Sequence, residues 1–179
     1  VCYNWGGRAC DGGTHEGQFV GNYYKMGPSS TQKTLLKADL EGTGTGSQSY
    51  YVSGNIRENT DGSKSSDKLG DTYRYTTSGG QMVDWEVFSS VPFFESHITT
   101  EPAEQALRSV LSDVGCNLPA IDNHDERMIS ETLNGTTSTV GSRTGKKGLI
   151  DKESDAEGFA GLNITEAARP EGFDTEGDG

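Results

Sequence analysis

The chain has 179 residues, 31% of them hydrophobic, with 25 glycines, a mean hydropathy of -0.67 and a formal net charge of -12. Residues 91–179 hold 17 acidic and 7 basic residues, so this half carries most of the charge and disfavours nucleic acid or anionic membrane as a partner. No apolar run approaches the roughly 20 residues of a membrane-spanning helix.

Short strands between glycine turns are predicted for the first half of the chain. Apolar and polar side chains alternate in residues 1–5 and 18–24, and strands are also expected within 48–56 and 81–93. The glycine-rich run EGTGTGS, residues 41–47, is typical of a flexible connector.

The three cysteines are Cys2, Cys10 and Cys116, and they provide neither a disulfide framework nor the paired spacing of a metal site. Their positions allow one disulfide, between Cys2 and Cys10. The sequence begins at Val1 without a methionine and ends at Gly179 inside a motif. We therefore expect an internal piece of a longer protein.

Residues 101–114 are predicted to form an amphipathic helix. Thr100 is expected to cap its start, and Gly115 is expected to follow its end. The residues that recur at the three- and four-residue spacing of one helix face are Ala103, Ala106, Leu107, Val110, Leu111 and Val114.

A second helix is predicted over residues 123–133, with Asp122 as its N-cap and Gly135 after its last turn. Asp125 and Glu126 fall in the first turn, where the helix dipole favours acidic side chains, so we interpret this cluster as helix-start electrostatics rather than as a metal site. The apolar residues expected to face inward are Met128, Ile129 and Leu133.

The order of these elements predicts a sheet stacked on itself and covered by the two helices. Asn22 and Asn55 stand next to predicted strands, where stacked asparagine side chains can hydrogen-bond in a ladder, a structural role. Three regions are expected: stacked strands over 1–95 with a long polar surface loop at 57–80, a helical and coil extension packed on them over 96–160, and an acidic linker over 161–179.

Blocks along nearly the whole chain carry a likeness to one enzyme family. Residues 3–31 combine YNWGGRACDGG with GQFVGNYYKMGPSST, residues 50–56 read YYVSGNI, and residues 99–142 contain NHDERMI followed by NGT. GLIDKESDAEGF (148–159) and RPEGFDTEGDG (169–179) continue the likeness. Together these blocks resemble polysaccharide lyase family 1, the pectate lyases, and in particular the C-terminal half of multi-domain bacterial members.

This resemblance implies an all-β fold, the C-terminal coils of a right-handed single-stranded parallel β-helix, with a two-helix C-terminal extension. It also implies cleavage of de-esterified polygalacturonate by β-elimination, in which calcium bridges substrate and protein carboxylates and an arginine acts as the base. The family's calcium aspartates and catalytic arginine lie upstream of the stretch that this chain matches, so the chain alone is expected to be inactive.

Three residues are candidates for contact with the polysaccharide. Arg8 follows the YNWGG turn, and a guanidinium suits bidentate binding of uronate carboxylates, although a surface arginine offsetting Asp11 is the alternative. Tyr24 can stack on a sugar face while Lys25 meets a carboxylate. The alternative for this pair is a packing tyrosine beside a solvated lysine.

Asp174, Glu176 and Asp178 occupy alternate positions of a partial calcium-loop motif, with Gly179 at the turn. Glutamate at the second of these positions departs from the motif, and its remaining ligands lie beyond the chain end. Calcium is therefore the expected cofactor, either here or at the lyase site that the resemblance implies.

We therefore hypothesise that the chain is part of a secreted, cell-surface or periplasmic pectate lyase. Its partners are pectate, an acidic plant polysaccharide, and the remainder of the parent chain or an N-terminal β-helix subunit, with no nucleic acid and no membrane. Two alternatives stay open: a non-catalytic β-helix that binds carbohydrate or serves as a surface module, and a lyase for pectin or another uronan.

Overall fold

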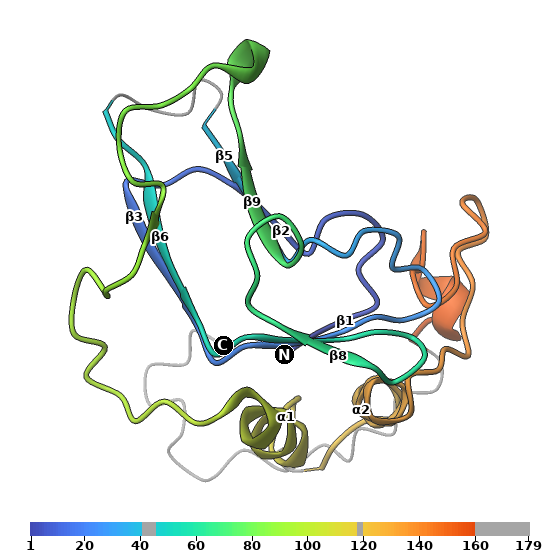
Figure 1. Ribbon diagram of the computed structural model, residues 1–179. Coiled ribbons are helices and arrows are strands. Elements are labelled where there is room, and N and C mark those ends of the chain that lie inside the picture. Colours follow the sequence, from blue (N-terminus) through green and yellow to red (C-terminus); the bar gives the residue numbers. More distant parts are fainter. Residues whose placement is uncertain (41–45, 118–119, 160–179) are drawn as a thin grey trace, which may run out of the picture.

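The computed structural model describes residues 1–40, 46–117 and 120–159. Within them, short strands form three sheets, and two α-helices and two short 3-10 helices follow or interrupt the strands (Figure 1). The first sheet contains β1 (Cys2–Tyr3), β4 (Tyr23–Lys25), β7 (Ile56–Glu58) and β8 (Lys64–Ser66). The second contains β2 (Cys10–Gly12), β5 (Leu36–Asp39) and β9 (Tyr73–Thr76), and the third contains β3 (Glu16–Val20), β6 (Ser49–Ser53) and β10 (Phe88–Ser89). The helices are α1 (Ala103–Ser112), α2 (Asn123–Asn134), η1 (Ser78–Gly80) and η2 (Glu153–Ala156).

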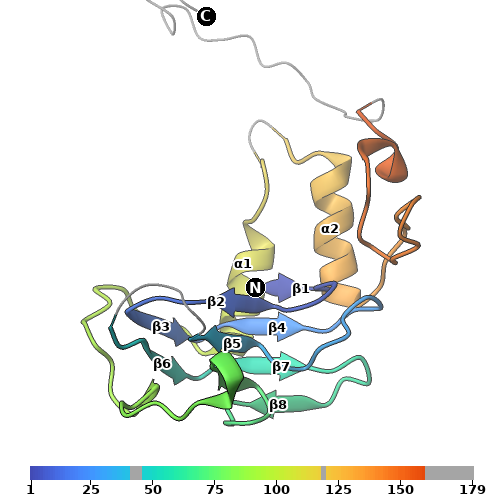
Figure 2. The same cartoon turned by 90° about the horizontal axis from the view of Figure 1, so that it is seen from above.

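The chain visits the three sheets in turn and then returns to the first. β1 pairs with β4, β2 with β5 and β3 with β6, and every one of these pairs is parallel. Figure 1 shows the sheets as three sides around a common interior, and Figure 2 shows β1, β4, β7 and β8 side by side in that order. The first strand of each sheet, β1, β2 or β3, is therefore an edge strand.

The larger apolar core lies between the second and third sheets. Its buried members are Leu36, Ala38, Tyr50 and Val87. The ring of Phe88 lies 6.1 Å from that of Tyr50 and 4.7 Å from that of Tyr73, measured between centroids, so aromatic packing joins the two sheets. A smaller cluster beside the first sheet contains Trp5, Tyr24, Met26 and Leu35.

The corner between the third and first sheets is built twice from the same dipeptide. Gly21 and Gly54 both adopt positive φ, 65° and 68°, which only glycine reaches without strain. Asn22 and Asn55 follow them, and Asn55 Oδ1 accepts hydrogen bonds of 3.0 Å from the backbone N–H and the side-chain amide of Asn22. The predicted asparagine ladder is confirmed, and its role is structural.

The prediction of an all-β right-handed parallel β-helix is wrong. The described residues form three small sheets, one of which is mixed, because β8 pairs antiparallel with β7, placing Ile56 opposite Ser66. Two α-helices belong to the same unit, and α1 packs on β4, so the described part of the chain combines helices with parallel and antiparallel strands.

The prediction of a long polar loop at 57–80 is also wrong, since this stretch contains β8 and β9. A tight turn makes the first reversal: the Gly62 N–H donates to Asn59 O at 2.9 Å, and the Asn59 N–H donates to Ser63 O at 2.8 Å. The buried guanidinium of Arg57 then ties the returning chain down through Asp71, 2.8 Å away. The polar side chains of this stretch hydrogen-bond to one another, while its backbone pairs in the strands of the sheets.

Both helix predictions are confirmed in position, and the second also in its caps. Asp122 Oδ1 accepts hydrogen bonds of 2.9 Å from the N–H groups of His124 and Asp125, and Gly135 ends α2 in the left-handed conformation. Thr100, however, does not cap α1, because that helix starts directly after Pro102 without a side-chain cap.

The inward face predicted for α2 is wrong in part. Met128 and Leu133 are exposed, whereas Glu131 and Thr132 are buried. Glu131 is satisfied by Ser138, whose backbone N–H donates to Glu131 Oε1 at 2.7 Å. The fully buried side chains of α2 are therefore polar, and Ile129 is only partly buried.

Side chains from the first strands hold residues 133–147 against the sheets. The Tyr3 hydroxyl donates to Thr136 O at 2.6 Å, and Asn4 Nδ2 donates to Lys147 O at 2.9 Å. The disulfide considered between Cys2 and Cys10 does not form: both are free cysteines, and they pack against different apolar clusters.

Candidate functional site

The outer face of the second sheet carries a row of charged side chains. Cys10, Leu36 and Tyr73 are in register across β2, β5 and β9 and contribute to the core. Because successive side chains of a strand point to opposite faces, the next residues of each strand, also in register, point outward. These residues are Asp11, Lys37 and Arg74.

Lys37 is the centre of this row. Its Nζ lies 3.5 Å from Asp11 Oδ1 and 3.9 Å from Asp39 Oδ2, and neighbouring side chains cover most of it. Partial desolvation acts in the opposite direction, but the hydrogen bond from Arg8 and the charge of Lys37 lower the pKa of Asp11 below its usual value. The Asp11 carboxylate is therefore ionised and held by Arg8 and Lys37.

Arg74 stands at the β9 end of the same row. Its side chain is exposed, and within the described ranges it has no ion-pair or hydrogen-bond partner. With Arg8 and Lys37 it gives this face three cations against two carboxylates, whereas the chain as a whole carries a net charge of -12. A planar guanidinium without a partner is suited to bidentate binding of a carboxylate.

Arg8 lies beside this face, in the loop between β1 and β2. It forms an ion pair with Asp11, and its side chain is about half exposed at 49%. The pairing is the one that the surface-arginine alternative anticipated. An exposed ion pair of this kind contributes little to stability, so the carboxylate of a ligand can compete for the guanidinium.

Tyr24 is not available to a sugar. It is 8% exposed, and its ring packs edge-on against Trp5 with centroids 6.3 Å apart. Burial raises the pKa of its hydroxyl to about 12, with smaller contributions from nearby acidic groups. The prediction of a stacking platform is wrong, because β4 lies between the inner core and the helices, which cover both of its faces.

Lys25 already has partners within the protein. Its Nζ donates to Leu133 O at the end of α2, 2.8 Å away, and lies 3.3 Å from Glu58 Oε1. A cation at a helix C-terminus is favoured by the helix dipole. Lys25 therefore fixes α2 to the first sheet, and the three predicted contact residues do not converge on one site.

Sequence reasoning missed Lys37 and Arg74. The signal was present in LKAD and YRYT. In each, a basic residue stands between two core residues, which is the alternation of inward and outward side chains expected of a strand. For Arg74 that signal lay inside a stretch predicted as a loop, so the alternation was not used.

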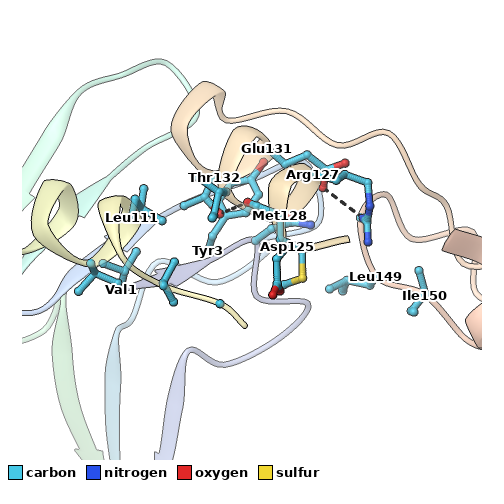
Figure 3. Close-up of a pocket in the computed structure, with 16 residues that line it drawn as sticks. Val1, Tyr3, Leu111, Asp125, Arg127, Met128, Glu131, Thr132, Leu149 and Ile150 are labelled. Carbon is cyan, nitrogen blue, oxygen red and sulfur yellow. Dashed lines mark hydrogen bonds and ion pairs between the residues drawn. The ribbon is translucent and has the colours of Figure 1, made fainter. Parts of the chain in front are cut away.

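A separate cavity of about 470 Å³ lies among β1, α1, α2 and residues 148–150 (Figure 3). Its polar groups already have partners: Asp125 Oδ2 accepts a 2.8 Å hydrogen bond from the Cys116 N–H, and Arg127 lies 3.8 Å from Glu131. The apolar residues that line it are Val1, Val110, Leu111, Val114, Met128, Ile129, Leu149 and Ile150. This arrangement suits an apolar occupant rather than acid–base chemistry.

The residues predicted to bind calcium, Asp174, Glu176 and Asp178, lie outside the described residues. In the part that the structure describes, no group of three or more histidine, cysteine, aspartate or glutamate side chains is placed to hold a metal ion. The two carboxylates of the charged face, Asp11 and Asp39, both pair with Lys37 and do not fit a calcium site.

No protein-family model, curated protein or solved structure matches this chain. The likeness to pectate lyases therefore rests on the residue blocks themselves. Across residues 1–40, 46–117 and 120–159, no helix is long and apolar enough to cross a membrane.

Proposed function

We propose that this chain is part of a secreted pectate-lyase-type enzyme that cleaves de-esterified polygalacturonate by calcium-assisted β-elimination. In this proposal the main catalytic arginine and calcium ligands are supplied from upstream of the chain. The described residues contribute a wall that binds the polymer. The observation that carries the proposal is the exposed Arg74 on the outer face of the second sheet, next to the buried Lys37 and with Arg8 in the loop before β2.

The geometry of this row suits a linear polyanion. Neighbouring strands lie about 4.8 Å apart, so Lys37 on β5 and Arg74 on β9 place two positive charges side by side, while Asp11 holds the same position on β2. Polygalacturonate presents a carboxylate on every sugar, and adjacent positive charges match that repeat better than a single cation does. An acidic protein that binds an acidic polymer needs such a local reversal of charge.

Contact between the two main blocks of family likeness also supports the proposal. Tyr3 and Asn4 belong to the first block and hydrogen-bond to residues at and beyond the end of α2, 133 and 143 positions along the chain. Lys25, also in the first block, bonds to Leu133 in the second. The blocks thus form one structural unit, as parts of a single enzyme would.

Polygalacturonate binding tests the proposal directly. We expect the chain to bind the polymer at low ionic strength and to lose most of that binding on Arg74→Ala, measured by affinity electrophoresis or calorimetry. Arg108→Ala is the matched control, because Arg108 is an exposed arginine on α1, away from this face. Absence of binding, or equal loss in both variants, contradicts the proposal.

Lyase activity separates this function from its alternatives. The chain alone is expected to release no unsaturated uronates, whereas the enzyme that also contains the upstream residues releases them from de-esterified polymer in the presence of calcium, as followed by ultraviolet absorbance. Binding without any product from the longer protein indicates a non-catalytic carbohydrate-binding module. Preference for methylated polymer without calcium indicates a pectin lyase.

A further inference from the structure

The loop that follows α2 is basic, although it belongs to the acidic half of the chain. Residues 91–179 hold 17 acidic and 7 basic residues, whereas residues 132–150 hold three basic residues and no acidic one. Two of the three, Lys146 and Lys147, are adjacent and exposed, and within the described ranges neither side chain has an ion-pair or hydrogen-bond partner. The third, Arg143, lies 3.9 Å from Asp151. The charges of the two lysines are therefore available to an anion.

The backbone that carries these lysines is held in place. Val140 and Lys147 form an antiparallel bridge. Lys147 O also accepts hydrogen bonds from two side chains of the sheet region, Asn4 Nδ2 at 2.9 Å and Ser29 Oγ at 2.8 Å. Because the backbone is already ordered, a ligand that binds the lysine side chains does not have to order the loop as well.

Lys146 lies against the loop between β1 and β2. A Cβ atom on Gly6 would stand 3.6 Å from Lys146 Nζ and 2.5 Å from Leu149 Cδ1, so the two segments are in close contact where Gly6 has no side chain. In Figures 1 and 2 the orange segment after α2 lies beside the blue loops that leave β1 and β4. Arg8 follows Gly6 by two residues, so their Cα atoms lie within about 7 Å of each other. The β1–β2 loop therefore connects Lys146 to the charged face of the second sheet, where Arg8 pairs with Asp11.

A cavity of about 360 Å³ opens at this contact. Besides Lys146 and Lys147, its lining includes two glycines, a proline and two residues with hydroxyl groups, Ser29 and Thr31. None of the described residues that line it is acidic. Cavities of about 300–1,000 Å³ are the usual size of small-ligand sites. Ammonium and hydroxyl groups are the donors that a carboxylate and a sugar hydroxyl require.

We propose that Lys146 and Lys147 form a second site for galacturonate units of the polymer that the outer face of the second sheet binds. The inference rests on the proposed function and extends it, because one polymer chain runs from Arg74 past the β1–β2 loop to the cavity. The two ammonium groups bind uronate carboxylates, and the sugar lies beside Thr31. A polymer held at both places binds more tightly than at either one, because the second contact is intramolecular.

The first test is binding of polygalacturonate to the 179-residue chain and to Lys146→Gln and Lys147→Gln, measured by calorimetry at low ionic strength. Each substitution removes one charge-assisted contact, so we expect the affinity to fall by about tenfold in each variant. Lys152→Gln is the matched control, because Lys152 is an exposed lysine of the same segment that does not line the cavity. Circular dichroism verifies that all three variants fold. Equal weakening by Lys152→Gln overturns the inference, since the effect then follows net charge alone.

A neutral polymer tests whether the lysines recognise the carboxylate. Methyl esterification removes the charge of each uronate and keeps the sugar chain. We expect Lys146→Gln and Lys147→Gln to bind the fully methyl-esterified polymer as the wild type does. A tenfold loss for this polymer as well shows that the two lysines do not act through uronate carboxylates, which overturns the inference.

The outcomes separate the second site from the proposed function. Binding that falls in Arg74→Ala and in neither lysine variant overturns the second site and leaves the proposed function intact. Binding that falls in the lysine variants and not in Arg74→Ala supports the second site and contradicts the role of the charged face. A longer protein that binds the polymer through these lysines without releasing unsaturated uronates contradicts the lyase function only. Absence of polymer binding in the wild type overturns both.

Discussion

The first and second sheets each contain three parallel strands of two to four residues but differ in what covers their outer faces. In the first sheet, consecutive residues Tyr23 and Tyr24 are 1% and 8% exposed, so both faces of β4 are covered. In the second sheet the central strand β5 is covered on both faces as well, with Leu36 4% and Lys37 9% exposed, but the edge strand β9 presents Arg74 to solvent. A strand buried on both faces gives structural support, whereas a strand with one solvated face has side chains available for a ligand.

Polar contacts differ in the same way. On the outer face of the first sheet, Tyr23 donates a hydrogen bond to Glu58, and Lys25 joins Glu58 to the end of α2. On the second sheet, Lys37 and its carboxylates form ion pairs across one face, and Arg74 has no partner within the described residues. Substitutions in the first sheet should therefore change stability, and those on the second should change binding.

Tyr23→Ala is expected to have the largest effect. The substitution removes a fully buried ring between the core and α1, which predicts a loss of about 3–5 kcal/mol in the free energy of unfolding. Denaturant titration monitored by circular dichroism measures it. Tyr23→Phe keeps the ring and loses only the hydrogen bond to Glu58, so its cost should be about 1 kcal/mol. Equal costs for the two substitutions would show that packing is not the cause.

Lys25→Met should have an intermediate effect. It removes the cation at the C-terminus of α2 and one partner of Glu58 while keeping the aliphatic stem, which predicts a loss of about 1–2 kcal/mol. Hydrogen exchange should accelerate first in the last turn of α2. Lys147→Met is the control, since the side chain of Lys147 is exposed and the contacts at this position come from its backbone carbonyl. Similar behaviour of both variants contradicts the anchoring role.

These contacts also show which features could be read from the sequence. The caps of α2 were predictable, because Asp122 and Gly135 act on neighbouring backbone groups. The pairing of Asn22 with Asn55 was predictable as well, since a repeated Gly-Asn dipeptide marks two equivalent corners. Local chemistry of this kind does not depend on the rest of the fold.

Features that depend on distant partners were not predictable. β9 lies in a polar stretch and becomes a strand because β5, more than thirty residues earlier, supplies its hydrogen bonds. The exposure of Met128 depends on which face of α2 meets the rest of the protein, and no local pattern of α2 encodes that. Lys25 looked like a surface cation because the end of α2, to which it binds, lies 108 residues away.

A pH-dependent effect is expected at the loop beyond α2. Hydrogen bonds from the backbone N–H groups of Ser142 and Asp151 lower the pKa of Asp155 from 3.8 to about 2. Because the pKa in the folded state is the lower one, the stabilisation is fully present above about pH 4 and is lost as the pH falls toward 2. Asp155→Asn should therefore reduce the protection of residues 142–151 at pH 6 and make it less dependent on pH between 4 and 2.

Hydrogen exchange measured across this pH range tests the effect. Glu153→Gln is the control, because Glu153 is exposed and lies two residues from Asp155 in the same 3-10 helix. If the wild type and Asp155→Asn lose protection in parallel as the pH falls, Asp155 is not the titrating group.

Arg74→Ala should have the smallest effect on stability and so gives the sharpest contrast with the first sheet. Its side chain is exposed and has no partner among the described residues, so the free energy of unfolding should change by less than about 0.5 kcal/mol. The same substitution is expected to abolish most of the binding to polygalacturonate. A ligand-binding face differs from a supporting face in that its side chains change the affinity for the ligand when substituted, but not the free energy of unfolding. If Arg74→Ala instead destabilises the protein as Tyr23→Ala does, the outer face of the second sheet is structural, and the difference drawn between the two sheets is wrong.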